Sequence, residues 1–171
     1  MIVEERMRTY INSLDMGNTP FLEELEKEAL AGRVPIIRKE MQSFLKMFLA
    51  ATRPMKILEV GTAVGFSTLL MCEYGPENLK ITTIENYEKR IPIARENFRK
   101  AGRESQIEFL TGDAGEILKE LTGTYDLIFM DIFMDGMLGM EAARCLRRYA
   151  PHVSIVFLTT TPAYALESYD V

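Results

Sequence analysis

The chain has 171 residues and a formal net charge of −5 at pH 7, and 47% of its residues are hydrophobic. This length and apolar content predict one domain over residues 1–171, and the negative charge argues against a general nucleic-acid-binding surface. The apolar runs are too short for a membrane span and the chain opens without a secretory pattern, so we expect a cytoplasmic protein with no membrane partner.

Two helices are expected before the first strand. Thr19 and Pro20 stand at the cap and the first position of a helix that ends at Gly32. Helical spacing predicts that the second helix buries one apolar face, formed by Ile37, Met41, Phe44, Leu45 and Phe48.

The rest of the chain alternates short apolar strands with helices. This alternation predicts parallel βαβ units, so we expect an α/β fold: a doubly wound, Rossmann-like parallel sheet of about five strands with helices on both faces. The expected strands are 57–60, 80–84, 106–110, 125–130 and 153–158, and the expected helices are 65–74, 88–101, 114–121 and 138–149.

A turn with two glycines follows the first expected strand. Gly61 ends the strand and Gly65 begins the helix, and backbone without a Cβ lets a ligand lie against it. A dinucleotide site has the spacing G-x-G-x-x-G. This chain has Glu59-x-Gly61-x-x-x-Gly65, with Thr62 and Ala63 where the second close glycine would stand. The spacing therefore argues against NAD.

An acidic residue, Glu85, closes the second expected strand. A carboxylate at this place can accept both hydroxyls of a ribose, so the turn and Glu85 together predict a nucleoside site. The alternative is an ordinary strand-to-helix connection in an unrelated α/β protein. The pattern resembles the E-x-G-x-x-x-G motif of class I S-adenosylmethionine-dependent methyltransferases, whose ligand carries a cationic sulfonium and no phosphate.

Further polar residues stand where the third and fourth expected strands end. Asp113 is placed to accept a hydrogen bond from an exocyclic amine, and Ala114 offers a backbone N–H to adenine. Asp131 ends the fourth strand, where an aspartate faces the ligand and usually binds a metal or removes a proton. The alternative for Asp131 is an N-cap of the next helix.

Residues 1–131 resemble the bacterial O-methyltransferase family that is similar to the caffeoyl-CoA and catechol O-methyltransferases. Within it, they resemble the small members that methylate 5-hydroxyuridine in tRNA. The resemblance is carried by Val34-Pro35 and by residues 57–66, 81–85, 112–114 and 125–131.

This resemblance implies S-adenosylmethionine as cofactor and a hydroxyl acceptor, either a small molecule or tRNA. It implies that Asp131 is catalytic, contacts the cofactor and holds a divalent cation such as Mg²⁺. The implied methyl-donor site consists of Glu59, Gly61, Thr62, Ala63, Gly65, Ser67, Glu85, Asp113, Ala114 and Asp131.

The resemblance to this family ends after Asp131. The family continues with Asp-Ala-Ala-Lys and a later strand that ends in Asp-Asn, whose side chains complete the metal site. Here Ile132-Phe133-Met134 follows, and the last expected strand ends in Thr159-Thr160-Thr161. We therefore expect weak metal binding and an impaired catalytic half. The family's final strands do not follow either, so this sheet edge is expected to be open or paired in a homodimer.

Residues 125–171 resemble part of a response-regulator receiver domain of the LytTR type, through residues 126–131, 134–137, 139–144 and 155–159. That resemblance implies that Asp131 is the phospho-acceptor. It also implies that the sequence joins parts of two families, either as a natural recombinant, as a designed chimera or as a truncated assembly. A receiver also needs an acidic pair after its first strand and a lysine after its last, and neither is found here. Three alternatives stay open: an O-methyltransferase with a weakened metal site, a non-catalytic S-adenosylmethionine-binding scaffold, and a phospho-receiver-like signalling module.

Overall fold

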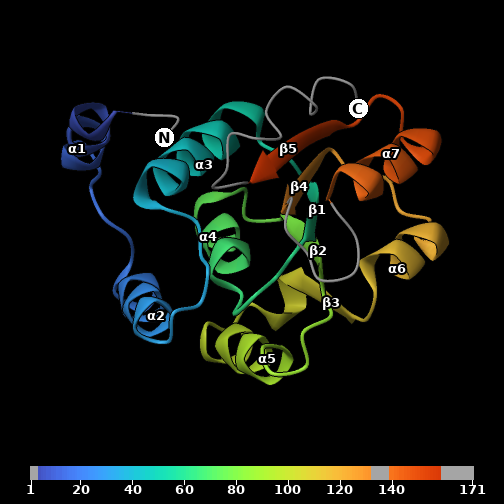
Figure 1. Cartoon of the computed structure of the whole chain (residues 1–171), viewed down its shortest axis with the longest axis horizontal. Helices are drawn as coiled ribbons and strands as arrows, with labels where there is room; N and C mark the ends of the chain where they lie inside the picture. The colour runs from blue at the N-terminus through green and yellow to red at the C-terminus, as the bar shows by residue number, and fades with distance from the viewer. Residues whose placement is uncertain (1–3, 132–138, 159–171) are drawn as a thin grey trace.

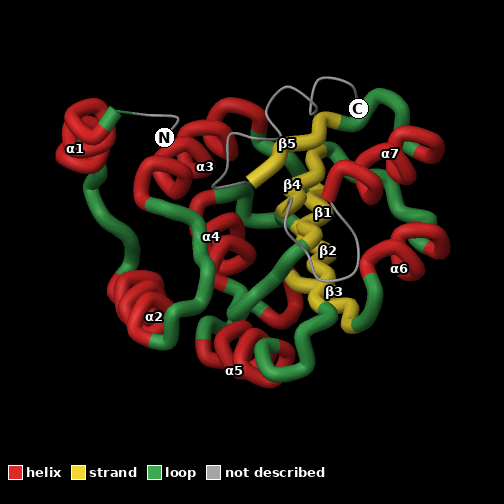
Figure 2. Tube along the Cα trace, in the orientation of Figure 1, coloured by secondary structure: helices red, strands yellow, loops and turns green. Residues whose placement is uncertain are grey.

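The computed structural model describes residues 4–131 and 139–158, and Figures 1 and 2 show their helices and strands. The helices are α1 (Glu5–Ser13), α2 (Pro20–Ala31), α3 (Lys39–Thr52), α4 (Phe66–Tyr74), α5 (Ile91–Lys100), α6 (Ala114–Glu120) and α7 (Gly139–Tyr149), with a 3₁₀ turn η1 (Glu104–Gln106). The strands are β1 (Lys56–Val60), β2 (Lys80–Glu85), β3 (Ile107–Thr111), β4 (Leu127–Asp131) and β5 (Ser154–Leu158).

The five strands form one parallel sheet in the order β3-β2-β1-β4-β5. The chain builds outward from β1 through β2 to β3, then returns to the other side of β1 with β4. Val60 pairs with Ile84 of β2 and with Met130 of β4, so β1 lies at the centre. The predicted doubly wound fold is confirmed. Ligands of such sheets bind beyond the carboxyl ends of the strands where the order reverses, which here is between β1 and β4.

Helices cover both faces of the sheet (Figure 1). On one face, α2, α3, α4 and α5 pack with strand residues such as Ile57, Ile81 and Phe129. On the other, α6 and α7 pack with residues such as Leu58 and Met130. Apolar side chains on both faces of a strand are what a fully covered parallel sheet requires. Among the described helices, none is long and apolar enough to cross a membrane.

The N-terminal helices differ from the expectation in two respects. Helix α1 was not predicted, and its described side chains are exposed. In α3, Phe44 lies 37% exposed, whereas Gln42 is fully buried. Gln42 is buried because its amide donates to Glu26 Oε1 at 2.9 Å and accepts from Asn18 at 2.8 Å. These polar contacts join α2 to α3. They bury Gln42, whereas the apolar periodicity predicted Phe44 on the buried face.

Candidate cofactor site

The turn between β1 and α4 is anchored to β2 through its backbone. The N–H groups of Gly61 and Thr62 both donate to the carbonyl of Ile84, at 3.0 and 3.1 Å. Gly61 has a φ of +108°, which favours glycine, and a Cβ there would lie 3.2 Å from the Cβ of Asp131. The sequence placed Gly61 and Asp131 at separate strand ends, and the fold brings them together at the switch point.

Glu85 holds the outer half of this turn. Its Oε2 accepts the backbone N–H of Ala63 at 2.6 Å, and its Oε1 accepts those of Asn86 and Tyr87 at 3.0 and 2.9 Å. Ala63 has a φ of +50°, an uncommon conformation for a residue with a side chain. The predicted ribose acceptor therefore also fixes the loop beside which the ribose would lie.

Glu59 lies beneath the turn and is 1% exposed. Its carboxylate accepts three hydroxyl groups, from Ser67 at 2.5 Å, Thr68 at 2.5 Å and Thr83 at 2.7 Å. Burial raises the pKa of Glu59, the three hydroxyl donors oppose that rise, and the nearby charge of Glu85 adds to it. Thr68 and Thr83 were not singled out from the sequence, although a threonine in an otherwise apolar buried segment is the signal that marks them.

The surface of the turn is formed by Gly61, Ala63 and Ser67, which are partly exposed, whereas Glu59 and Thr62 are buried. The buried hydrogen bonds of Glu59 and Thr62 hold the exposed part of the turn, and the cofactor contacts predicted for these two residues remain a prediction.

Gly65 is required for packing at the start of α4. It has a φ of +83°, and a Cβ there would lie 2.5 Å from Cε1 of Phe98. Since Phe98 belongs to the core and comes from α5, the glycine lets α5 approach the turn. Asn97 of the same helix donates to the carbonyl of Val64 at 2.8 Å. Gly65 is itself buried, so what the structure shows for it is packing.

Asp113 and Ala114 follow β3, next to Glu85. Gly112 donates to the carbonyl of Glu85 at 3.0 Å, and this bond joins the two strand ends. The Asp113 side chain is exposed and caps α6 by accepting the N–H of Glu116 at 3.0 Å. The predicted adenine contacts of both residues remain a prediction.

The described residues do not assemble a site for a divalent cation. Among them, no three His, Cys, Asp or Glu side chains come together, whereas Mg²⁺ and Ca²⁺ prefer several oxygen ligands. Asp131 is partly exposed at the end of β4. Asp135 and the threonines at 159–161, which also carry side-chain oxygens, lie outside the described residues. We therefore derive no chemical step through a metal.

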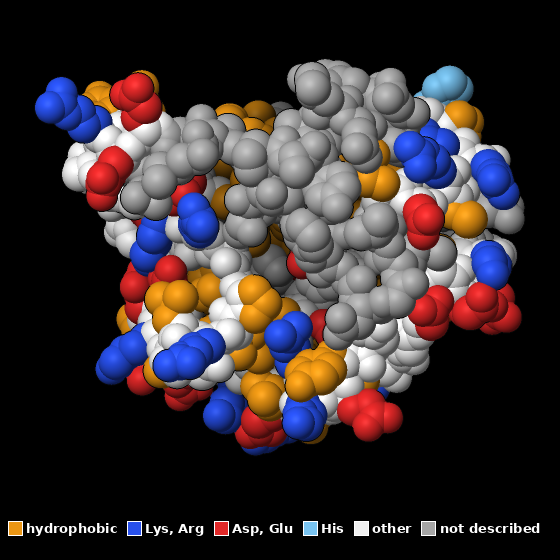
Figure 3. All heavy atoms as spheres, viewed as in Figure 1, with side chains coloured by type: hydrophobic (Ala, Val, Ile, Leu, Met, Phe, Trp, Pro, Cys, Tyr) orange, Lys and Arg blue, Asp and Glu red, His pale blue; other side chains and the backbone are white. Residues whose placement is uncertain are grey.

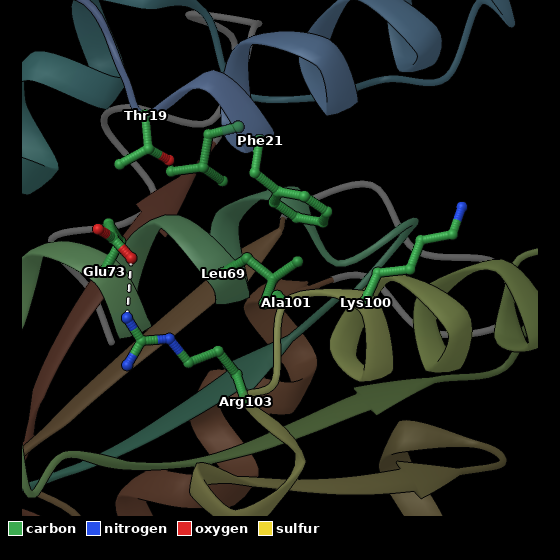
Figure 4. Close-up of a pocket in the computed structure, with 8 residues that line it drawn as sticks. Thr19, Phe21, Leu69, Glu73, Lys100, Ala101 and Arg103 are labelled. Atoms are coloured by element: carbon green, nitrogen blue, oxygen red, sulfur yellow. Dashed lines mark hydrogen bonds and ion pairs between the residues drawn. The ribbon is translucent and has the colours of Figure 1, made fainter.

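A pocket of about 200 Å³ lies elsewhere, between α2, α4 and α5 (Figure 4). It is lined by Thr19, Phe21, Leu22, Leu69, Glu73, Lys100, Ala101 and Arg103. Arg103 donates to Glu73 at 2.8 Å along its edge. Glu73 and Arg103 belong to the segments that lead into β2 and β3, whereas the glycine turn follows β1, and no residue of the turn lines the pocket. It is not the candidate cofactor site.

Several basic residues form ion pairs with acids. Figure 3 shows Lys and Arg side chains mixed with Asp and Glu along its lower edge, where Figure 1 places α2 and α5. Lys39 forms ion pairs with Glu23 and Glu26 at 3.2 and 2.7 Å, and Lys46 pairs with Asp15 at 3.2 Å. These two lysines of α3 bind acids of the chain before it, so their role here is structural.

The O-methyltransferase family matches residues 12–137, and the chain therefore belongs to this family. A Mycobacterium tuberculosis catechol O-methyltransferase is 30% identical over 125 residues, which cover 71% of this chain and 57% of the relative. A Niastella koreensis catechol O-methyltransferase is 36% identical over 92 residues, which cover 52% of this chain and 42% of the relative. The chain thus spans about half the length of the curated relatives it matches.

Solved structures agree with the fold. The SAH-bound Podospora anserina methyltransferase PaMTH1 is 27% identical with a TM-score of 0.77, covering 89% of this chain and 67% of that one. A Geobacter sulfurreducens methyltransferase is 18% identical with a TM-score of 0.75, and the match covers 92% of this chain and 79% of that one. The family match runs through Asp131 to residue 137, so it includes the first part of the segment for which the sequence suggested a receiver domain, and the comparisons do not show that second resemblance.

Proposed function

We propose that this protein binds S-adenosylmethionine at the β1–α4 turn and transfers its methyl group to a hydroxyl acceptor. The observation that carries the proposal is the bond from Ala63 N to Glu85 Oε2, 2.6 Å long, in a member of the O-methyltransferase family. It fixes a turn with Gly61, Ala63 and Ser67 at its surface next to a carboxylate placed for ribose. The SAH-bound relative PaMTH1 supports the choice of cofactor.

In the proposed reaction the acceptor oxygen attacks the sulfonium methyl group. An O–C bond forms as the C–S bond breaks, the electron pair stays on sulfur, and the acceptor hydroxyl loses its proton. Asp131 is the carboxylate beside Gly61 at the switch point, and in this proposal it takes that proton directly or through a water molecule.

The acceptor class rests on relatives and resemblance. Curated relatives are named for catechol and caffeoyl-CoA, which supports a small aromatic hydroxyl. The resemblance to tRNA 5-hydroxyuridine methyltransferases supports a nucleoside hydroxyl. The weakened metal site at Asp131 leads us to expect slow turnover with either acceptor.

The test has two parts. Calorimetric titration with S-adenosylhomocysteine should show binding by the purified chain. Labelled S-adenosylmethionine should then transfer its methyl group to a catechol, to caffeoyl-CoA or to tRNA carrying 5-hydroxyuridine, each assayed with and without Mg²⁺. Binding without transfer would identify a scaffold. No binding, together with an acyl phosphate formed from a small phosphodonor, would favour the receiver alternative.

Asp131→Ala separates the cofactor site from the reaction. We expect this variant to bind S-adenosylhomocysteine within about twofold of wild type, because the ribose and turn contacts are intact, and to lose roughly 100-fold or more of the transfer rate. Transfer at the wild-type rate would remove Asp131 from the reaction.

A further inference from the structure

Thr83 connects Glu59 to the glycine turn. This residue of β2 is fully buried. Its hydroxyl donates to Glu59 Oε2 at 2.7 Å and lies 2.6 Å from the hydroxyl of Thr62, which is also fully buried. Thr83 thus has no surface for a ligand, and all the polar contacts of its side chain are with residues of the turn or beneath it.

When the Glu59 carboxylate is ionised, the proton count fixes the direction of these hydrogen bonds. A threonine hydroxyl has one proton to donate and two lone pairs that accept. Since Thr83 gives its proton to Glu59, Thr62 donates to Thr83. The Thr62 hydroxyl is therefore held in one orientation, and the chain Thr62 to Thr83 to Glu59 is directed and fully satisfied. Such a connected buried network rigidifies its surroundings.

The network bears on the part of the turn that faces solvent. Thr62 stands between Gly61 and Ala63, both partly exposed, and its carbonyl accepts the N–H of Gly65 at 2.8 Å. A displaced Thr62 would shift the exposed backbone on either side of it. A shift there would also disturb the bond from Ala63 to Glu85.

We propose that Thr83 is a positioning residue for the cofactor: through Thr62 it sets the backbone of the turn, and it acts on cofactor affinity without touching the cofactor. This inference rests on the proposed function, because it needs a cofactor bound at the turn. By this inference, a buried residue outside the glycine motif contributes to the affinity for the cofactor.

The chain offers matched variants for the test. Thr83→Val keeps the shape and removes the hydroxyl, and Thr83→Ser keeps the hydroxyl. Thr82→Val is the control, because Thr82 is the adjacent residue of β2 and its hydroxyl instead contacts Glu108 at 2.9 Å and Tyr125 at 3.3 Å. Calorimetric titration of the full chain with S-adenosylhomocysteine gives Kd, and urea unfolding shows which variants fold.

We expect Thr83→Val to weaken binding about tenfold, Thr83→Ser to restore it to within about twofold of wild type, and Thr82→Val to leave it unchanged. Thr62→Val should weaken binding by a similar factor, and the Thr62→Val, Thr83→Val double variant should lose little more than either alone. Wild-type affinity in a folded Thr83→Val, or an equal loss in Thr82→Val, would overturn the inference while the proposed function stands. A wild type that does not bind would overturn both.

Discussion

At the scale of single residues, Glu85 holds the turn and, in the proposed function, also binds the ribose. Glu85 is 7% exposed, and its carboxylate already accepts three backbone N–H groups. Each carboxylate oxygen has room for about two hydrogen bonds, so acceptor capacity is left for ribose hydroxyls. Loss of this one side chain would therefore remove the tie to Ala63 together with the proposed ribose contact.

The first prediction concerns Glu85→Ala. Hydrogen bonds to a charged group are worth about 1.5–3 kcal/mol each, so we expect S-adenosylmethionine affinity to fall at least tenfold in a folded protein. Calorimetric titration measures the loss. Glu88→Ala changes an exposed carboxylate on the same connection and is expected to bind as wild type. Unchanged affinity in Glu85→Ala would remove the ribose assignment.

The second prediction compares two glycines of similar backbone conformation. Gly65 and Gly102 have φ of +83° and +64°, but only at Gly65 would a Cβ meet another residue, Phe98. Gly102→Ala should cost about 1–2 kcal/mol from the backbone alone. Gly65→Ala should cost about 1–3 kcal/mol more, because the ring must move. Urea unfolding of both variants tests this, and equal costs would contradict the packing argument.

At the scale of elements, the buried carboxylate of Glu59 joins β1 to α4 through Ser67 and Thr68 and to β2 through Thr83. A carboxylate in this place is costly because burial disfavours its charged form. The compensation is that three hydroxyl groups, two of them on the buried residues Thr68 and Thr83, all find an acceptor. The elements that carry the turn are thus held by polar as well as apolar contacts.

The third prediction is the pH dependence that this arrangement creates. Since the pKa of Glu59 is raised above its ordinary value of 4.5, the folded chain holds this proton more tightly than the unfolded chain does. Its contribution to stability is complete below the unfolded pKa and is lost as pH rises through the folded pKa. The free energy of unfolding of wild type should therefore decline relative to Glu59→Gln as pH rises above about 4.5. Urea unfolding across pH measures the difference, with exposed Glu120→Gln as control; a constant difference for Glu59→Gln would contradict the raised pKa.

At the scale of the whole molecule, the sheet and the glycine turn at its edge were predictable because their signals are local. Apolar runs identified all five strands, and Gly61, Gly65 and Glu85 marked the turn and its acidic neighbour. The support beneath the turn was predictable only in part: Glu59 belongs to the glycine motif, but its partner Thr83 lies 24 positions away, and a threonine in a buried strand does not show by itself which residue it bonds to.

The start of β4 shows the same limit. The strand was expected from residue 125 and begins at Leu127, because Asp126 is engaged at the start of β1. Its Oδ2 accepts the N–H groups of Met55 and Lys56 at 2.8 and 2.9 Å. A side chain that bonds to backbone far away in the sequence changes where a strand begins. Strand propensity depends on the local sequence, so it does not predict this change.

The last prediction addresses whether the two segments suggested by resemblance unfold together. Strand β4 belongs to both segments, lies between β1 and β5, and is buried on both faces: Phe129 packs into one apolar cluster and Met130 into the other. A strand shared in this way should couple the clusters.

We expect Phe129→Ala to lower the free energy of unfolding by about 3–5 kcal/mol, and the variant to unfold in one transition. Far-UV circular dichroism follows the helices and tyrosine fluorescence follows the tertiary packing, since the chain has no tryptophan. Coincident curves for wild type and variant would support one cooperative unit over residues 1–171. A first transition that Phe129→Ala moves and a second that it leaves in place would instead mean that the segment after β4 folds on its own.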